Sequence, residues 1–309
     1  MSIETTFPFL YNYWPHVVAL IVTYASVVYF VNAKGRNTEK KGENKVETKN
    51  PASANKRKKY LSPDQEAEVH EDEIVDADGA KISSALPEDL PHVPLTTYTR
   101  YSEKEMIERS AAFYDDMNNR RTVRFYSSEP VPKEVMENII RTAGTAPSGA
   151  HTEPWTYVVV GDKDLKASVR QLIEEEEEIN YNKRMGVQWT TDLMPLKTNW
   201  VKEYLTTAPY LILVFKQAYG FNPDGTKKNH YYNEVSVAIA TGILISAIQK
   251  AGLVTLTSTP LNCGPALRTL LGRPNNEKLM ILLPVGYPAK DCSVPDLARK
   301  PLDEISVWF

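Results

Sequence analysis

The chain has 309 residues, of which 42% are hydrophobic and 24% are charged, and its formal net charge is −3. This composition is typical of a globular protein with a buried core, and neither the charge nor any motif indicates nucleic acid as a partner. Two cysteines are too few for a disulfide framework, and the five scattered histidines predict no metal site.

The first predicted element is a membrane-spanning helix. No Asp, Glu, Lys or Arg occurs between Glu4 and Lys34, and the apolar run inside this window approaches the ~20 residues that cross a bilayer. Basic residues follow the run, so the positive-inside rule predicts a cytosolic C-terminal domain. A signal peptide is the alternative, but its basic start is missing. We expect residues 1–33 to be a single-pass membrane anchor.

Residues 34–95 are predicted to be a flexible charged tether. They are rich in Lys, Glu, Asp, Ser and Pro and poor in large apolar residues, so they cannot bury enough surface to fold alone. Residues 96–309 are predicted to form one domain in which helices and strands alternate.

The domain begins with two predicted helices and a strand. Ser102 and Glu105 form a capping-box pattern that predicts a helix continuing to Met117. A second helix is predicted over 132–142, and the β-branched run 155–161 predicts a buried strand.

A third helix, starting near Asp162, carries five consecutive glutamates at 174–178. Its apolar positions keep helical spacing; they are Leu165, Val169, Leu172, Ile173 and Ile179. A charge run of this kind is usually a solvated helix face.

The second half of the domain is predicted to supply most of the core. Residues 209–215 predict a central strand, and 233–252 are apolar on nearly every side, which predicts a buried helix. A second membrane span is the weaker alternative for this segment. A strand over 253–258, a helix from Pro265 and a strand over 279–288 follow, and the last twenty residues predict an arm.

Three stretches carry side chains suited to binding a ligand. Arg120, Arg121 and Arg124 can pair with phosphate oxygens, although a surface salt-bridge cluster explains them equally well. The Gly- and Pro-containing loop 144–155 can present backbone N–H groups, or can be a plain surface turn. The hydroxyl run 257–259 ends a predicted strand, where hydroxyl groups can bond a planar polar ligand.

These stretches occur in an order that resembles one family. The segments "RRTVR" and "TAPSGAHTEPW" resemble the nitroreductase-like flavoproteins. Six segments resemble more closely one group of them, the iodotyrosine deiodinases: "TAPSGAHTEPW", "EEEEEINYNKRMG", "TNWVKEYL", "HYYNEVSVAIATGIL", "TPLNCGP" and "VPDLARKPLD". The resemblance covers about residues 100–305. It implies an α+β fold whose central mixed sheet is flanked by helices, a homodimer, and FMN bound at the dimer interface.

The resemblance also implies which residues bind FMN. The basic stretch and the C-terminal arm would hold the phosphate, and the other residues would border the flavin. Thr259 is expected to hydrogen-bond flavin N5, which favours one-electron steps, and Ser258 keeps the hydroxyl of the family's usual threonine. The implied FMN-binding residues are Arg120, Arg121, Thr122, Arg124, Pro147, Ser148, Thr257, Ser258, Thr259 and Arg299.

The implied reaction is reductive dehalogenation of mono- and diiodotyrosine to tyrosine and iodide. Glu177 would hold the α-ammonium, Lys202 the α-carboxylate, and Tyr181 the same zwitterion, all on a lid over the substrate. The Ala150 N–H would face the phenolate, so Ala150 and Thr259 are the implied catalytic positions. A zwitterion needs one anion and one cation at a fixed separation, and charged hydrogen bonds are strong.

Of the glutamate run, only Glu177 is then expected to be functional. The other four are expected to face solvent, and their mutual repulsion predicts a segment that is mobile until a ligand closes the lid.

The electron source is predicted from an absence of motifs. No nicotinamide-binding motif is visible, so we expect NADPH to supply electrons through a separate reductase. A general NAD(P)H-dependent nitroaromatic or quinone reductase of the same fold is the main alternative, and it would not need the Glu177, Tyr181 and Lys202 set. A flavin-free interaction protein is a second alternative, and it would be expected to have lost the arginine cluster.

Overall fold

The computed structural model describes residues 86, 87, 89–223 and 225–309. The predicted membrane anchor and most of the predicted tether lie outside the described residues. Within the described ranges, no helix is both long and apolar enough to cross a membrane.

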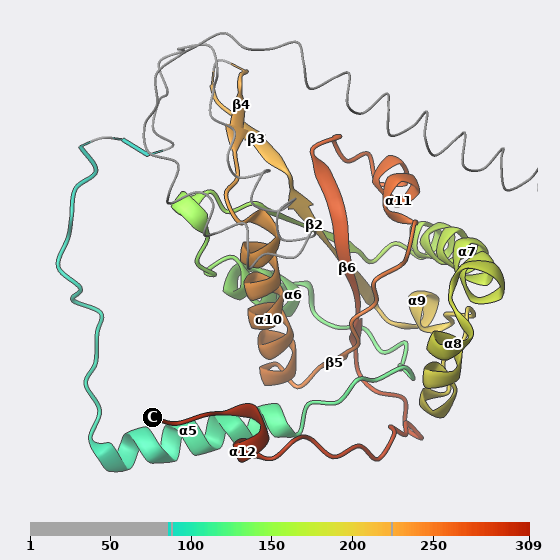
Figure 1. Ribbon diagram of the computed structural model, residues 1–309, viewed down its shortest axis with the longest axis horizontal. Coiled ribbons are helices and arrows are strands. Elements are labelled where there is room, and N and C mark those ends of the chain that lie inside the picture. The colour runs from blue at the N-terminus through green and yellow to red at the C-terminus, as the bar shows by residue number, and fades with distance from the viewer. Residues whose placement is uncertain (1–85, 88, 224) are drawn as a thin grey trace, which may run out of the picture. The chain divides into compact units, whose positions relative to one another are not determined.

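Helices and strands alternate along the described chain (Figure 1). The helical elements are α5 (Glu103–Asn118), α6 (Lys133–Ala143), η1 (Gly149–His151), α7 (Lys163–Ile179), the π-helical turn η2 (Asn180–Arg184), α8 (Val187–Leu193), η3 (Met194–Leu196), α9 (Tyr204–Thr207), α10 (Asn233–Lys250), α11 (Gly264–Leu270) and α12 (Leu302–Ile305). The strands are β1 (Trp155–Val160), β2 (Tyr210–Gln217), β3 (Tyr219–Phe221), β4 (Lys227–Asn229), β5 (Val254–Thr255) and β6 (Glu277–Gly286).

The main sheet has the strand order β1-β2-β6-β5, and each of its ladders is antiparallel. This corrects the prediction of a mixed sheet. In the described chain the only parallel pairing is the isolated bridge between Thr122 and Thr255. Strands joined through helices can pair in either direction, so the alternation of helices and strands predicted the elements but not the strand directions.

The predicted buried strand at 155–161 is the edge strand β1. It has one neighbour, β2, and only Val160 among its six residues is fully buried. A β-branched run does not distinguish an edge strand from a central strand.

Two hydrophobic clusters cover the two faces of the sheet, because successive side chains of β2 point to opposite sides. Leu211, Leu213 and Phe215 pack with α7, α9 and α11. Ile212 and Val214 pack with α6 and α10. Figure 1 shows the sheet between these two groups of helices.

The predicted helix starts are confirmed by their caps. Ser102 and Glu105 form both hydrogen bonds of a capping box at the start of α5. The Asp162 carboxylate accepts the Leu165 N–H at 2.8 Å at the start of α7. The end of α7 differs from its prediction, since Ile179 is 38% exposed and the helix continues there as the π turn η2.

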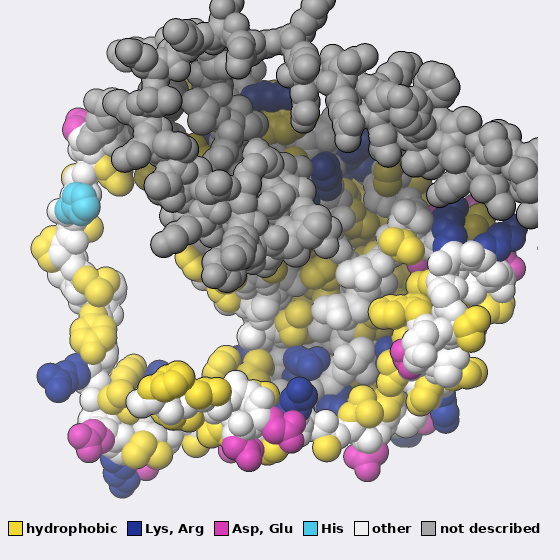
Figure 2. All heavy atoms as spheres, viewed as in Figure 1, with side chains coloured by type: hydrophobic (Ala, Val, Ile, Leu, Met, Phe, Trp, Pro, Cys, Tyr) yellow, Lys and Arg dark blue, Asp and Glu magenta, His cyan; other side chains and the backbone are white. Residues whose placement is uncertain are grey.

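The prediction that α10 is buried is correct for one face only. Val237 and Ala240 are buried, whereas Val235 and Ile239 on the other face are 57% and 44% exposed. Hydrophobic side chains also lie exposed along α5 and the extended segment before it (Figure 2). The described chain therefore leaves apolar helix surface without a cover of its own.

Replacing Tyr157 by Phe is expected to stabilise the fold by about 1 kcal/mol. The Tyr157 hydroxyl is buried and has no hydrogen-bond partner among the described residues, and burial raises its pKa. Removing an unsatisfied buried hydroxyl removes its desolvation cost. The free energy of unfolding in urea measures the effect. Tyr126→Phe is the control, because the Tyr126 hydroxyl donates to the Pro284 carbonyl at 3.2 Å, so its loss should destabilise by about as much. Equal destabilisation by both substitutions would contradict the prediction.

Candidate active site

Four arginines line one pocket of about 290 Å³. The chain leaves α5 and runs beside β5, where the Val123 N–H donates to the Thr255 carbonyl at 3.2 Å. Arg120, Arg121 and Arg124 reach the pocket from this stretch, and Arg299 reaches it from the C-terminal arm. The structure thus brings together all four arginines predicted to hold one anion, with Thr122 between them.

The arm is fixed to the pocket through its own arginine and its backbone. The Arg299 guanidinium donates to the carbonyl and side-chain oxygens of Asn118, at 2.9 and 2.8 Å, and to the Arg120 carbonyl at 2.8 Å. The Arg121 guanidinium donates to the Pro295 carbonyl. The arm is consequently part of the pocket wall, to which it contributes Val294, Pro295, Leu297, Ala298 and Arg299.

The pocket is strongly cationic. Burial lowers the pKa of Arg120, and the charges of Arg299 and Arg121 lower it further. No carboxylate lines the pocket, and none of the four arginines forms an ion pair within the described part of the chain. Within the described residues the arginines therefore do not form a salt-bridge cluster, and their charges are open to an anionic ligand.

The predicted hydroxyl run lies at the end of β5. Ser258 forms two backbone hydrogen bonds with Leu282 of β6, at 2.9 and 2.8 Å, and its side chain hydrogen-bonds the buried Tyr204 hydroxyl. Thr257 and Thr259 are exposed in the single chain. The strand pairing holds the run beside the arginine stretch and leaves two hydroxyls free to meet a ligand.

Glu177, Tyr181 and Lys202 come together at the C-terminal end of α7. Glu177 and Lys202 are only 7% and 6% exposed. The Lys202 ammonium lies 5.4 Å from the Tyr181 ring centre and donates to the Asn199 carbonyl. Burial lowers the pKa of Lys202, and the Glu177 carboxylate partly opposes this. The two charges interact without a direct ion pair in the described chain, so each can take a partner from a ligand.

Arg124 connects this charged trio to the arginine pocket. Its positive charge lowers the pKa of Lys202 and opposes the rise that burial causes in the pKa of Tyr181 and Tyr204. Arg124 of the anion pocket therefore lies near enough to act electrostatically on the charged trio and on Tyr204.

Two glutamates of the run differ from their prediction. Glu174 and Glu176 are only partly exposed, with 24% and 27% of their side chains accessible, and they pair with Arg170 and Arg184. Glu174 also accepts the Lys202 backbone N–H at 2.5 Å. Neighbouring cations thus relieve the repulsion that was expected to mobilise this segment.

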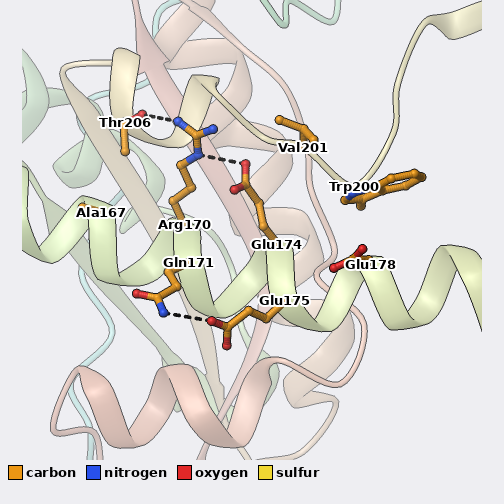
Figure 3. Close-up of a pocket in the computed structure, with 9 residues that line it drawn as sticks. All are labelled: Ala167, Arg170, Gln171, Glu174, Glu175, Glu178, Trp200, Val201 and Thr206. Carbon is orange, nitrogen blue, oxygen red and sulfur yellow. Dashed lines mark hydrogen bonds and ion pairs between the residues drawn. The ribbon is translucent and has the colours of Figure 1, made fainter.

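The outer face of α7 carries a separate pocket of about 460 Å³ (Figure 3). Arg170 bonds Glu174 there, and Gln171 bonds Glu175. The lining residues do not include Glu177. This pocket therefore lies outside the candidate site, and its polar groups largely satisfy one another.

The predicted loop around Pro147 and Ser148 has an unusual backbone. The Ser148 hydroxyl accepts the Glu153 N–H at 2.9 Å, and Ala150 has a left-handed φ of 48°. A Cβ at Gly149 would meet the Tyr231 carbonyl at 2.7 Å, so glycine is required there. Within the described chain, no residue accepts the Ala150 N–H.

This loop does not meet the arginine pocket within one chain. The Gly149 N–H donates to Ser236 near the start of α10, at 3.4 Å. Arg121 instead lies beside Gln249 and Gly252 at the other end of α10. The 18 residues of α10 span about 27 Å. Pro147, Ser148 and Ala150 are therefore separated from the arginines with which they were predicted to share a ligand.

Sequence reasoning missed Asn180 and Arg184. The Asn180 side chain is completely buried and donates to Glu177, and Arg184 bonds both Asn180 and Glu176. A signal was present, because asparagine is unfavourable inside a helix unless its side chain has a specific partner.

Comparisons with known proteins agree with these features. Residues 117–287 match the nitroreductase family model. The chain is 54% identical to iodotyrosine deiodinase 1 of Homo sapiens over 298 residues, which cover 96% of this chain and 99% of the relative. It is 67% identical to iodotyrosine deiodinase of Danio rerio over 220 residues, which cover 71% of this chain and 74% of the relative. A crystal structure of oxidized iodotyrosine deiodinase bound to FMN and 3-iodo-L-tyrosine is similar, with 31% identity and a TM-score of 0.55, covering 62% of this chain and 96% of that chain.

Proposed function

Because this chain belongs to the nitroreductase family, and within it to the iodotyrosine deiodinases, we propose that it is an oxidoreductase that removes iodide from mono- and diiodotyrosine with FMN as cofactor. In this reaction the carbon–iodine bond breaks and a carbon–hydrogen bond forms. Two electrons and one proton are consumed, iodide leaves, and tyrosine is the product.

The observation that best supports this substrate is the charged trio at the end of α7, in which Glu177 and Lys202 are buried. Glu177 supplies an anion, Lys202 a cation and Tyr181 a hydroxyl, and the two charges have no direct ion pair with each other in the described chain. An amino-acid zwitterion satisfies both charges at once. A general nitroaromatic or quinone reductase would gain nothing from burying this pair.

The arginine pocket fits the FMN phosphate. Arg120, Arg121, Arg124 and Arg299 lack carboxylate partners among the described residues and surround a space of about 290 Å³. Thr257, Ser258 and Thr259 would border the flavin from the end of β5. Bound FMN supplies the electrons of the reaction, and the chain supplies orientation and electrostatics.

Ala150 is the proposed contact for the substrate oxygen. A backbone N–H that donates to the phenolate stabilises it, and a bound phenolate is more easily protonated at the carbon that carries iodine. The Ala150 N–H has no acceptor in the described chain, and Ala150 has a left-handed φ of 48°.

A homodimer is part of this proposal. The loop that carries Ser148 and Ala150 contacts α10 at Ser236, and Arg121 lies beside Gln249, about 20 Å further along the same helix, so one chain does not place both around one flavin. A partner's loop can complete the site. The exposed apolar residues of α10, Val235 and Ile239, would then be covered by the second copy.

The remaining parts of the proposal rest on sequence. Residues 1–33 are proposed to anchor the protein in a membrane as a single pass, residues 34–95 to be a tether, and residues 96–309 to be a cytosolic catalytic domain. NADPH is proposed as the electron source through a separate reductase, because the sequence has no nicotinamide motif.

Purification of the full chain in detergent, followed by titration with 3-iodo-L-tyrosine, tests the function. We expect a yellow protein whose flavin fluorescence is quenched by the ligand, and release of iodide when dithionite supplies electrons. A yellow protein that ignores iodotyrosine but reduces nitroaromatics with NADPH would support the general reductase instead. A colourless protein that FMN cannot reconstitute would contradict both.

A further inference from the structure

We propose that Asn180 is a positioning residue that orients the Glu177 carboxylate for the substrate ammonium. The inference rests on the proposed function, since it assumes that Glu177 binds this group. It adds a residue that does not touch the substrate and acts through Glu177.

Asn180 is placed to act in this way by its burial and its donors. Its side chain is completely buried. The amide nitrogen donates to the Glu177 carboxylate at 3.1 Å and to the Leu261 carbonyl at 3.1 Å. The two amide hydrogens thus join the end of α7 to the loop that follows the hydroxyl run.

Arg184 fixes which way the amide points. Its guanidinium donates to the Asn180 side-chain oxygen at 3.0 Å and also pairs with Glu176. A guanidinium has no acceptor, and the other two partners of the amide are both acceptors. Rotating the amide by 180° would therefore break three hydrogen bonds, so one orientation is enforced.

The backbone at Asn180 explains why this position can reach Glu177. Asn180 opens the π turn η2, and its carbonyl accepts the Met185 N–H at 2.7 Å, five residues later. π turns inside helices are frequent at functional sites. Here the turn follows α7 directly, and Tyr181 lies within it.

Glu177 depends on the hydrogen bond from Asn180 because its side chain is almost fully buried and has little access to water. Its other carboxylate oxygen has no hydrogen bond within the described chain and yet is not sealed from solvent. One oxygen is held by Asn180, and the other remains for a ligand. A carboxylate already oriented before binding loses less conformational freedom when the ammonium arrives.

The test is Asn180→Ala in the full chain with FMN bound. We expect the dissociation constant for 3-iodo-L-tyrosine to rise about tenfold, measured by flavin fluorescence quenching. The affinity for 3-(4-hydroxy-3-iodophenyl)propanoic acid, which lacks only the ammonium, should change less than about twofold. In a Glu177→Gln background, Asn180→Ala should have little further effect, because residues that act as a unit are not additive.

Gln171→Ala is the matched control. Gln171 makes the same amide-to-carboxylate bond, to Glu175 at 2.8 Å, on the outer face of α7 (Figure 3). Its loss should leave the affinity for both ligands unchanged.

Arg184→Met is a second variant, for the case in which Asn180→Ala does not fold. It opens no buried space. It should weaken iodotyrosine binding a few-fold and change the affinity for the ligand without an ammonium much less.

Three results would count against the inference. Equal weakening of both ligands would indicate a general structural role for Asn180, and additivity with Glu177→Gln would indicate that it does not act through Glu177. A wild-type protein that holds FMN but does not bind 3-iodo-L-tyrosine would overturn the proposed function itself, and this inference with it.

Discussion

Substituting Glu177 by Gln is expected to weaken the binding of 3-iodo-L-tyrosine by about 100-fold, a loss of about 3 kcal/mol. The substitution keeps the shape of the side chain and its acceptor for Asn180, but removes the only negative charge of the charged trio. The substrate ammonium would then be buried without a counter-charge, and Lys202 would lose the carboxylate that opposes its desolvation. Flavin fluorescence quenching measures the dissociation constant.

Two comparisons make this prediction specific. Glu178→Gln removes the neighbouring charge, which is exposed, and should leave binding unchanged. The ligand without an ammonium should bind wild type and Glu177→Gln with similar affinity. If Glu178→Gln weakened iodotyrosine binding as much as Glu177→Gln, the general charge of the run would be responsible instead.

Substituting Arg120 by Gln is expected to weaken FMN binding by about 10- to 100-fold while stabilising the protein without FMN. Hydrogen bonds to a charged group contribute about 1.5–3 kcal/mol, so losing a guanidinium from the phosphate pocket reduces affinity by this factor. In the FMN-free protein the same substitution removes repulsion from Arg299 and Arg121, the charges that lower the pKa of Arg120.

The opposite signs of the two effects make the test decisive. FMN affinity is measured by titrating apoprotein and following fluorescence, and stability by thermal melting with and without FMN. Arg141→Gln is the control, because Arg141 is exposed on α6 and lies outside the pocket. If the Arg120→Gln apoprotein melted at a lower temperature than the wild-type apoprotein, Arg120 would have a stabilising partner within the protein, which would contradict the prediction.

Local signals in the sequence predicted most of the elements, because they depend on neighbours along the chain. The capping box at Ser102 located the start of α5, and the helix predicted to start near Asp162 is α7, which Asp162 caps. The apolar run 209–215 located the central strand β2. Strand direction and edge position, by contrast, depend on contacts between distant segments, so the mixed sheet and the buried β1 were predicted wrongly.

The candidate site was only partly predictable for a similar reason. Arg299 lies 179 residues after Arg120 in the sequence. The family resemblance, not their spacing, predicted that they share a pocket. Local reasoning assigned four glutamates to solvent, yet Glu174 and Glu176 have cationic partners. The role inferred for Asn180 depends on Leu261, 81 residues further along, and no pattern near Asn180 indicates that contact.

The attachment of the C-terminal arm has a consequence for biosynthesis. The last guanidinium of the arginine pocket comes from Arg299, and it is fixed to the backbone of Asn118 and Arg120. A nascent chain cannot assemble this pocket until the ribosome has translated, and released from its exit tunnel, the sequence through Arg299. If the pocket holds FMN as proposed, translation that terminates before Arg299 would yield a polypeptide that keeps most of its core but lacks the fourth guanidinium of the pocket.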